Sequence, residues 1–447
     1  MTILEIPDNV ATTAFDRTLI KRSLDKAGRR QKLLTVGLIA PLACFTFIFF
    51  IVPIVSFLFL SVANPEVRAG LPETATAIRD WDGMSTPTER IFGALLSDLQ
   101  NADRRTDAIG AARRLNYDVS GFHGLITKTI SALAESTAAA DQPTAAPDGF
   151  SIFGTDKSET SPTSSSRPST AKQRLIDADP RWGEMRYWTA IKRGIWPITP
   201  LYMLTALDLR LGDDGSIEGV SPDHRIYVTL IVRTFAVSGI VTFVSLLLGF
   251  PLAIFIHRQP TNRASFLMFL VLVPLWTSIL VRTTAWLVLL QEQGLLNDLI
   301  VMLHLSDTRI SLIHNRFGVY VAMVHICLPF MVLPLLSVMK SVPSVYIRAA
   351  ASLGATPTRV FFKVYLPLVF PGIGAGVLLV FIMCLGFYVT PALVGGPRDQ
   401  MLSYFIAMAV NKDLNWGLAS ALSIVLISIL VATLLVFRRF ALATFAR

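Results

Sequence analysis

The sequence predicts an all-α membrane protein with six transmembrane helices and a large extracytoplasmic insert between the first and second helices. The 447 residues are 53% hydrophobic and 16% charged, with a mean hydropathy of +0.56, which is too apolar for a soluble enzyme of this size. A transmembrane helix needs about 20 consecutive apolar residues. Six runs are long enough: 33–62, 226–256, 264–290, 318–339, 368–392 and 416–437.

The first element is a tail, residues 1–32, that leads into a retained first span, 33–62. The tail lacks the charged start and short apolar core of a cleavable signal peptide. Basic residues beside a span stay in the cytoplasm, and six of them precede the first span: Lys21, Arg22, Lys26, Arg29, Arg30 and Lys32. Six crossings return the tail at 438–447 to the same side, so both termini are expected in the cytoplasm. The net charge of +9 therefore reflects topology rather than nucleic-acid binding.

Residues 63–225 form the insert, which is too long and polar for a simple connection. Its first part, 86–136, is expected to be helical, because apolar residues recur at spacings of three and four in two places: Ile91, Leu95, Leu96 and Leu99, then Ile126, Ile130 and Leu133. The stretch 137–172 is rich in Ala, Ser, Thr and Pro and is expected to be mobile. The aromatic stretch 181–207 suits helices at the membrane interface or helices packed on the rest of the insert, and the sequence leaves both open.

Nothing in the insert predicts catalysis. Asp118, Ser120 and His123 are close in sequence, but no nucleophile motif frames them. The three cysteines, Cys44, Cys327 and Cys384, fall within predicted spans and lack the spacing of a metal site or a disulfide framework.

The five remaining spans form a five-helix core, 226–437, which contains a polar segment at 341–367. We call this segment the coupling segment. Ser341 and Pro343 favour a helix start, Gly354 favours a helix stop, and Thr356-Pro357 opens a second short helix that Pro367 is expected to close. Small side chains at Ala349, Ala350 and Ala351 allow another protein to approach closely, and three basic residues can face its acidic groups: Arg348, Arg359 and Lys363. An ordinary loop between spans is the alternative.

Several motifs resemble a known family. Ala349-Ala350, Gly354-Ala355, Phe361, Val364 and Leu366-Pro367 resemble the coupling loop of membrane subunits of ATP-driven (ABC) importers. Over 226–437, the runs at 272–297, 328–335 and 389–397 resemble the spermidine/putrescine-type permeases of binding-protein-dependent importers, so we call 226–437 the permease core.

This resemblance implies the type I ABC importer permease fold in a bacterial inner membrane. It also implies three kinds of partner: a cytoplasmic ABC ATPase dimer, a second permease subunit that is identical or similar, and a periplasmic solute-binding protein. The chain has no GxxxxGK[ST] phosphate loop, so we expect it to carry no cofactor and to rely on ATP-Mg bound by the partner ATPase. The residues expected at the ATPase joint are Arg348, Ala349, Ala350, Gly354, Ala355, Arg359, Phe361, Lys363 and Val364.

Two positions depart from the family pattern. Arg348 stands where the family's loop commonly has Glu, which reverses the charge there. Phe387 and Tyr388 precede the VTPAL stretch, where polyamine permeases often carry an acidic residue, so a cationic solute loses one counter-charge.

Polar and aromatic residues within the spans are candidates for the substrate pathway. The candidates are Arg233, Trp276, Trp286, Phe387 and Tyr388. Arg233 can equally reach the outer headgroups, and the aromatic residues also suit membrane interfaces. Arg282 is expected to pair with Glu292, and His325 to be a satisfied histidine within the bundle.

We therefore expect a permease subunit, not an enzyme, that moves a small polar solute. A polyamine such as spermidine or putrescine, or a related amine compound, is the expected solute. An opine, an amino-acid derivative or another organic solute is the alternative. The six predicted spans contain no Asp or Glu, which disfavours an ion-coupled secondary transporter.

Overall fold

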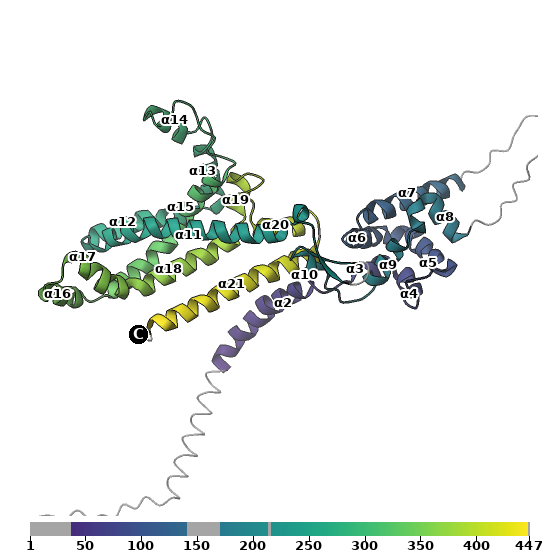
Figure 1. The fold of residues 1–447 in the computed structure, drawn as a ribbon, viewed down its shortest axis with the longest axis horizontal. Helices are drawn as coiled ribbons and strands as arrows, with labels where there is room; N and C mark the ends of the chain where they lie inside the picture. The colour runs from purple at the N-terminus through teal and green to yellow at the C-terminus, as the bar shows by residue number, and fades with distance from the viewer. Residues whose placement is uncertain (1–36, 141–169, 213–215, 446–447) are drawn as a thin grey trace, which may run out of the picture. The chain divides into compact units, whose positions relative to one another are not determined.

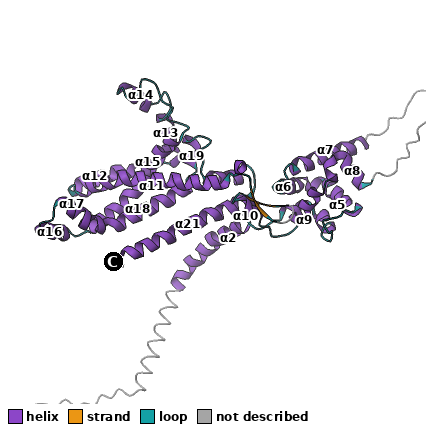
Figure 2. Cartoon of the chain, in the orientation of Figure 1, coloured by secondary structure: helices purple, strands orange, loops and turns teal. Residues whose placement is uncertain are grey.

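The computed structural model describes residues 37–140, 170–212 and 216–445, and these residues are almost entirely helical (Figure 1). Figure 2 shows two short strands, β1 (Leu209–Leu211) and β2 (Ile217–Gly219), which pair antiparallel with Arg210 opposite Glu218. The predicted all-α fold is confirmed. The expected tail at 1–32 and most of the expected mobile stretch at 137–172 lie outside the described residues.

The first predicted span is one apolar helix, Gly37–Phe59. It contains a π-helical turn, η1 (Phe47–Ile51), followed by α2 (Val52–Phe59). Pro53 lies in the first turn of α2, and the wider π turn accommodates its missing N–H and its ring. The helix presents apolar side chains all round, which is what a span exposes to lipid.

The insert has a hydrophobic core of its own. Trp182 and Trp188 are buried at its centre with Phe92, Phe122 and Tyr187, and their rings meet edge to face or tilted. Trp188 Nε1 donates to the carbonyl of Trp182 at 2.9 Å, so its polar edge is satisfied. The helices around this core are α3 (Glu66–Gly70), α4 (Pro72–Ala77), α5 (Glu89–Gln100), η2 (Ala102–Arg104), α6 (Arg105–Leu115), α7 (Phe122–Ala140), α8 (Ala171–Ala178), η3 (Pro180–Gly183) and α9 (Met185–Gly194).

The structure decides between the two alternatives for 181–207. Helix α9 buries Tyr187, Trp188 and Ile191 in the insert core. Helix α10 (Leu201–Thr205) instead packs on the permease core, where Tyr202 meets Leu418 and Leu422. The stretch therefore joins the two parts of the chain.

Asp208 fixes the start of the second span. It adopts a left-handed backbone with φ 55°, and its carboxylate accepts from the backbone N–H groups of Ile226, Tyr227 and Val228 at 2.7–3.1 Å. A carboxylate on these free N–H groups caps a helix and suits its positive end. The helix that it caps, α11 (Tyr227–His257), follows the short turn η4 (Pro222–His224).

Three long helices form the centre of the permease core: α11, α15 (Arg316–Ser341) and α18 (Leu366–Gly386). Their facing sides bury Val237, Cys327, Met331 and Cys384, and the thiols of Cys327 and Cys384 touch at 3.6 Å. Helices α20 (Leu402–Asn411) and α21 (Trp416–Phe445) pack on one another beside α11.

The predicted third span, 264–290, is not one straight helix. Helix α12 (Thr261–Leu272) and the turn η5 (Val273–Trp276) are bent by 97° from α13 (Ile279–Leu289). Ser278 caps α13, and Arg282 donates to the carbonyl of Thr277 at 2.8 Å, so Glu292 is not its partner. The described residues thus contain five helices long enough to cross a membrane, or six if the bent pair counts as one span.

The predicted fifth span also differs from expectation. A continuous helical stretch runs from Pro357 to Gly386, through α17 (Pro357–Val360), the π turn η6 (Phe361–Tyr365) and α18. Pro367 therefore does not close the second helix of the coupling segment, because the π turn before it accommodates the missing N–H. The span ends at Gly386 rather than 392, and Phe387 and Tyr388 separate it from α19 (Val389–Val394).

Candidate functional site

The coupling segment lies at one end of the permease core, where α16 (Ser344–Ser352) and α17 project beyond the long helices (Figure 1). We call this end the coupling end. The opposite end, where α11 and α15 begin, is the insert end. A short loop with Val342 and Pro343 in extended conformation separates α16 from α15.

Gly354 ends α16 in a defined way. It adopts φ +78°, its N–H donates to Ala351 O at 3.0 Å, and the N–H of Ala355 donates to Ala350 O at 3.2 Å. These two bonds form the Schellman motif that caps many helices, in which glycine takes the left-handed position. No atom lies within 4 Å of the place where a Cβ would stand on Gly354. Backbone conformation, rather than space within this chain, therefore selects glycine there.

The inner side of the segment rests on the end of α11. The Phe361 ring packs against Phe250 at 6.4 Å and against Tyr365 at 5.9 Å. A cavity of about 480 Å³ lies between the segment and α11, lined by His257 of α11, by Arg258 directly after it, and by Ile347, Ala351, Ala355 and Val360 among others. The segment is thus held to the bundle by aromatic contacts but is not tightly packed.

The nine residues predicted for the ATPase joint divide into two sets. Ala350, Ala355, Phe361 and Val364 are half-buried, and Ala355 and Phe361 line the cavity beside α11. The exposed set is Arg348, Ala349, Gly354, Arg359 and Lys363. None of its three basic side chains makes an ion pair within the part of the chain that the structure describes. Nearby apolar side chains are exposed as well, and Leu353 at the tip is 88% accessible. The segment therefore presents an exposed surface of small, basic and apolar side chains.

The predicted pathway residues have separate surroundings. Trp276 lies exposed next to Phe269, whereas Phe387 is buried in the bundle core and Tyr388 is exposed. Trp286 donates from Nε1 to Nδ1 of His325 at 3.1 Å, so this histidine has a partner within the bundle, as expected. No two of the four aromatic rings touch in the described chain.

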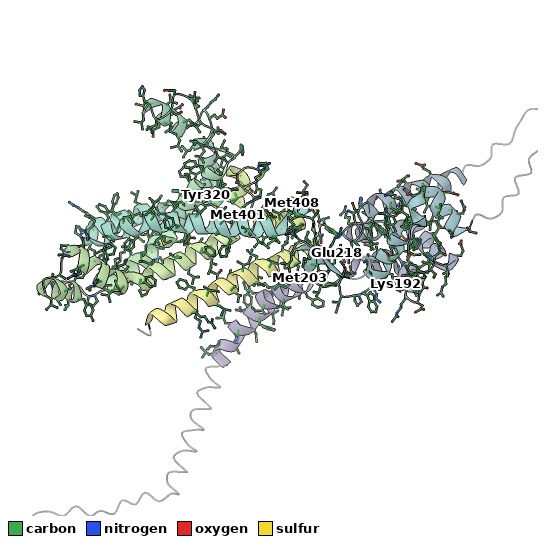
Figure 3. The ribbon with its side chains drawn as sticks, in the orientation of Figure 1. Lys192, Met203, Glu218, Tyr320, Met401 and Met408 are labelled. Atoms are coloured by element: carbon green, nitrogen blue, oxygen red, sulfur yellow. The ribbon has the colours of Figure 1, made fainter. Side chains whose placement is uncertain are left out.

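Arg233 lies at the insert end with residues that the sequence did not single out. Its Nη1 donates to the carbonyl of Gln400 at 3.3 Å. Arg316, the first residue of α15, pairs through Nε with Asp399 Oδ1 at 3.0 Å. Figure 3 labels Tyr320, one turn further along α15, and Met401, which follows the loop that carries Asp399 and Gln400. Sequence reasoning missed Asp399 because it lies beyond the predicted fifth span.

Comparisons with known proteins identify relatives of the permease core. A family described as "Binding-protein-dependent transport system inner membrane component" matches residues 238–443, which excludes the insert. The spermidine/putrescine transport system permease protein PotB of Haemophilus influenzae is 32% identical over 216 residues, covering 48% of this chain and 76% of the relative. PotB of Escherichia coli K12 is also 32% identical, with 78% of the relative covered. The inner membrane ABC transporter permease protein YdcU of the same organism is 32% identical over 224 residues, covering 46% of this chain and 70% of the relative.

Solved structures also match in part. A bacterial alginate ABC transporter, in complex with its alginate-bound periplasmic protein, matches with a TM-score of 0.39 at 18% identity, covering 48% of this chain and 78% of that chain. The MetNI methionine ABC transporter, in an inward-facing conformation, matches with a TM-score of 0.39 at 17% identity, covering 50% of this chain and 98% of the other.

Proposed function

Since this chain belongs to the binding-protein-dependent inner membrane components, as a spermidine/putrescine-type permease subunit of an ABC importer, we propose that it forms half of a translocation pathway for a polyamine or a related amine compound. The other half is a second permease subunit. A solute-binding protein delivers the solute from outside, and both termini of the chain lie in the cytoplasm of a bacterium with the permease in its inner membrane.

The coupling segment is the observation that carries this proposal. It is the place where a partner ATPase transmits its motion, since it is exposed, rigidly capped at Gly354 and directly continuous with α18. The ATPase dimer binds and hydrolyses ATP-Mg, and its closure pushes the segment. The helical stretch Pro357–Gly386 conveys that push along the bundle. Arg348, Arg359 and Lys363 meet acidic groups of the ATPase, and Ala349 and Gly354 allow close contact.

The proposed solute class rests on the relatives, whose names give spermidine and putrescine as transported compounds. Uptake of labelled putrescine and spermidine by energised cells, with and without this chain, tests it. We expect uptake to be lost on deletion and restored by the intact gene. Unchanged uptake of both compounds would remove the polyamine from the proposal but leave the importer.

A second solute class is favoured by one observation. Phe387 and Tyr388 leave no acidic side chain ahead of the VTPAL stretch, and the insert end of the core instead carries Arg233 and Arg316. An amino-acid derivative bears a carboxylate as well as an amine. Its carboxylate can pair with these arginines, which a purely cationic solute cannot do.

A further inference from the structure

Three charged side chains lie near one another at the insert end of the permease core. Arg233 comes from α11, Arg316 from the first turn of α15, and Asp399 from the loop between α19 and α20. Both Arg316 and Asp399 lie within electrostatic range of Arg233. We call these three residues the arginine cluster.

The charges of the cluster do not balance. Asp399 is almost fully buried and is already engaged, because one oxygen accepts from Arg316 Nε at 3.0 Å and the other accepts from the backbone N–H of Gly396 at 3.2 Å. Arg233 has a single hydrogen bond among the described residues, the long one to the Gln400 carbonyl. The cluster therefore holds two guanidinium groups and one carboxylate, and that carboxylate pairs with Arg316, which leaves the positive charge of Arg233 uncompensated.

The position of Arg233 makes that charge costly. It lies six residues after the start of α11, about 9 Å along the helix, and α11 is one of the helices apolar enough to cross a membrane. A charge near a low-dielectric region needs a partner or water. A guanidinium with free N–H groups in such a place favours an anionic oxygen group, which it can bind in a bidentate manner.

The surroundings hold the cluster in place. The loop before Asp399 packs closely, since a Cβ on Gly395 would stand 2.8 Å from Val319 Cγ2. The N–H of Leu402 donates to the Thr234 hydroxyl at 2.8 Å, next to Arg233 in sequence. The Gln400 carbonyl is thus fixed relative to α11, and Arg233 is oriented before any ligand arrives.

An anionic oxygen group has two sources, a solute carboxylate and a lipid phosphate. The surface of α11 that suits lipid is an apolar groove of about 650 Å³, lined by Val232, Phe235 and residues of α21. Arg233 does not line this groove. Arg233 instead bonds the loop that follows the VTPAL stretch, and the half-exposed Arg316 lies beside it. These contacts favour a solute carboxylate over a lipid phosphate as the ligand of Arg233.

We propose that Arg233, oriented by Gln400 and flanked by the Arg316–Asp399 pair, binds a carboxylate of the transported solute, so that among amine compounds the permease prefers those that also carry a carboxylate. The proposal rests on the importer function given above and assigns the solute class that this end of the pathway selects. A fully cationic polyamine meets a net positive cluster there and is disfavoured.

Two probes of nearly equal length test the solute class. Putrescine carries two ammonium groups, and 4-aminobutanoate carries one ammonium and one carboxylate. We expect millimolar 4-aminobutanoate to raise the melting temperature of the purified full chain in detergent more than putrescine does, because a ligand that binds only the folded state stabilises it according to its affinity. Arg233→Met should abolish the shift, whereas Arg398→Met, which removes an exposed arginine from the same loop, should keep it.

Three results would overturn the proposal. One is a shift with putrescine equal to that with 4-aminobutanoate. Another is a 4-aminobutanoate shift that survives in Arg233→Met. The third is a shift that depends on Arg233 but is produced by added phosphatidylglycerol and not by 4-aminobutanoate, which would assign Arg233 to lipid. This measurement needs no ATPase, so its failure is distinct from a failure of ATP-driven uptake, which tests the importer function itself.

Discussion

At the scale of single residues, Arg348 determines the charge that the middle of α16 exposes. It is exposed at the middle of α16 without an ion pair among the described residues, and it reverses the charge that the resembling family commonly has there. We expect Arg348→Glu to weaken association with the partner ATPase by roughly fivefold, because an exposed ion pair contributes up to about 1 kcal/mol.

Co-purification of the ATPase with the tagged permease, at low salt and at about 0.5 M salt, measures this effect. The loss should shrink at high salt, where exposed charges are screened. Arg263→Glu, an exposed basic residue of α12, is the matched control and should bind as the wild type does. Equal binding of Arg348→Glu and wild type at low salt would show that Arg348 does not meet an acidic group.

Gly417 marks a second position where a single atom matters. A Cβ there would collide with the ring of Tyr202, which is buried between α10 and α21. We expect Gly417→Ala to lower the free energy of unfolding by about 1–3 kcal/mol, the usual cost of overpacking. Thermal denaturation in detergent measures it, with Gly239→Ala as control, since no atom lies within 4 Å of a Cβ at Gly239. If Gly417→Ala and Gly239→Ala have the same melting temperature, the contact of α10 with α21 is not tight.

At the scale of elements, the insert depends on a buried carboxylate. Hydrogen bonds from the Arg181 side chain, aided by Lys128, hold the pKa of Asp179 well below its ordinary value. A lowered pKa in the folded state gives stability that is present above the ordinary pKa of about 3.9 and is lost as the pH falls below it.

We therefore expect Asp179→Asn to lower the free energy of unfolding by about 1.5–3 kcal/mol at pH 7, the value of a hydrogen bond to a charged group. The difference from wild type should shrink between pH 4 and pH 3. Tryptophan fluorescence during unfolding reports it, because Trp182 and Trp188 are buried in the insert core. A difference that stays constant down to pH 3 would mean that the charge of Asp179 contributes nothing.

The coupling segment is the element whose helix stop was most predictable. Its glycine stop and the start at Thr356-Pro357 follow from residue type alone, and the structure shows both. The second helix was not predictable in full, because a proline at 367 usually ends a helix. The π turn at Phe361–Tyr365 prevents this, because its wider ring accommodates the missing N–H of Pro367.

At the scale of the whole molecule, the apolar runs gave the number and order of spans because hydrophobic length is a local property. The 97° bend within 264–290 depends on how Ser278 and Arg282 satisfy the backbone on either side of Thr277. The arginine cluster could not be predicted from the sequence, because it also depends on contacts between distant residues. Arg316 and Asp399 are 83 residues apart, so only the packing of α15 against the loop before α20 brings them together.

The central claim is that ATP hydrolysis on a partner drives transport through the coupling segment. The most direct measurement is ATP-dependent solute accumulation in proteoliposomes that contain the permease pair, the ATPase and the binding protein. We expect Gly354→Val to reduce accumulation at least tenfold, since a β-branched residue cannot readily adopt φ +78°. Gly354→Asn should retain more of the wild-type accumulation, because asparagine tolerates that backbone conformation. Accumulation that needs no ATP, or that Gly354→Val leaves unchanged, would contradict the account.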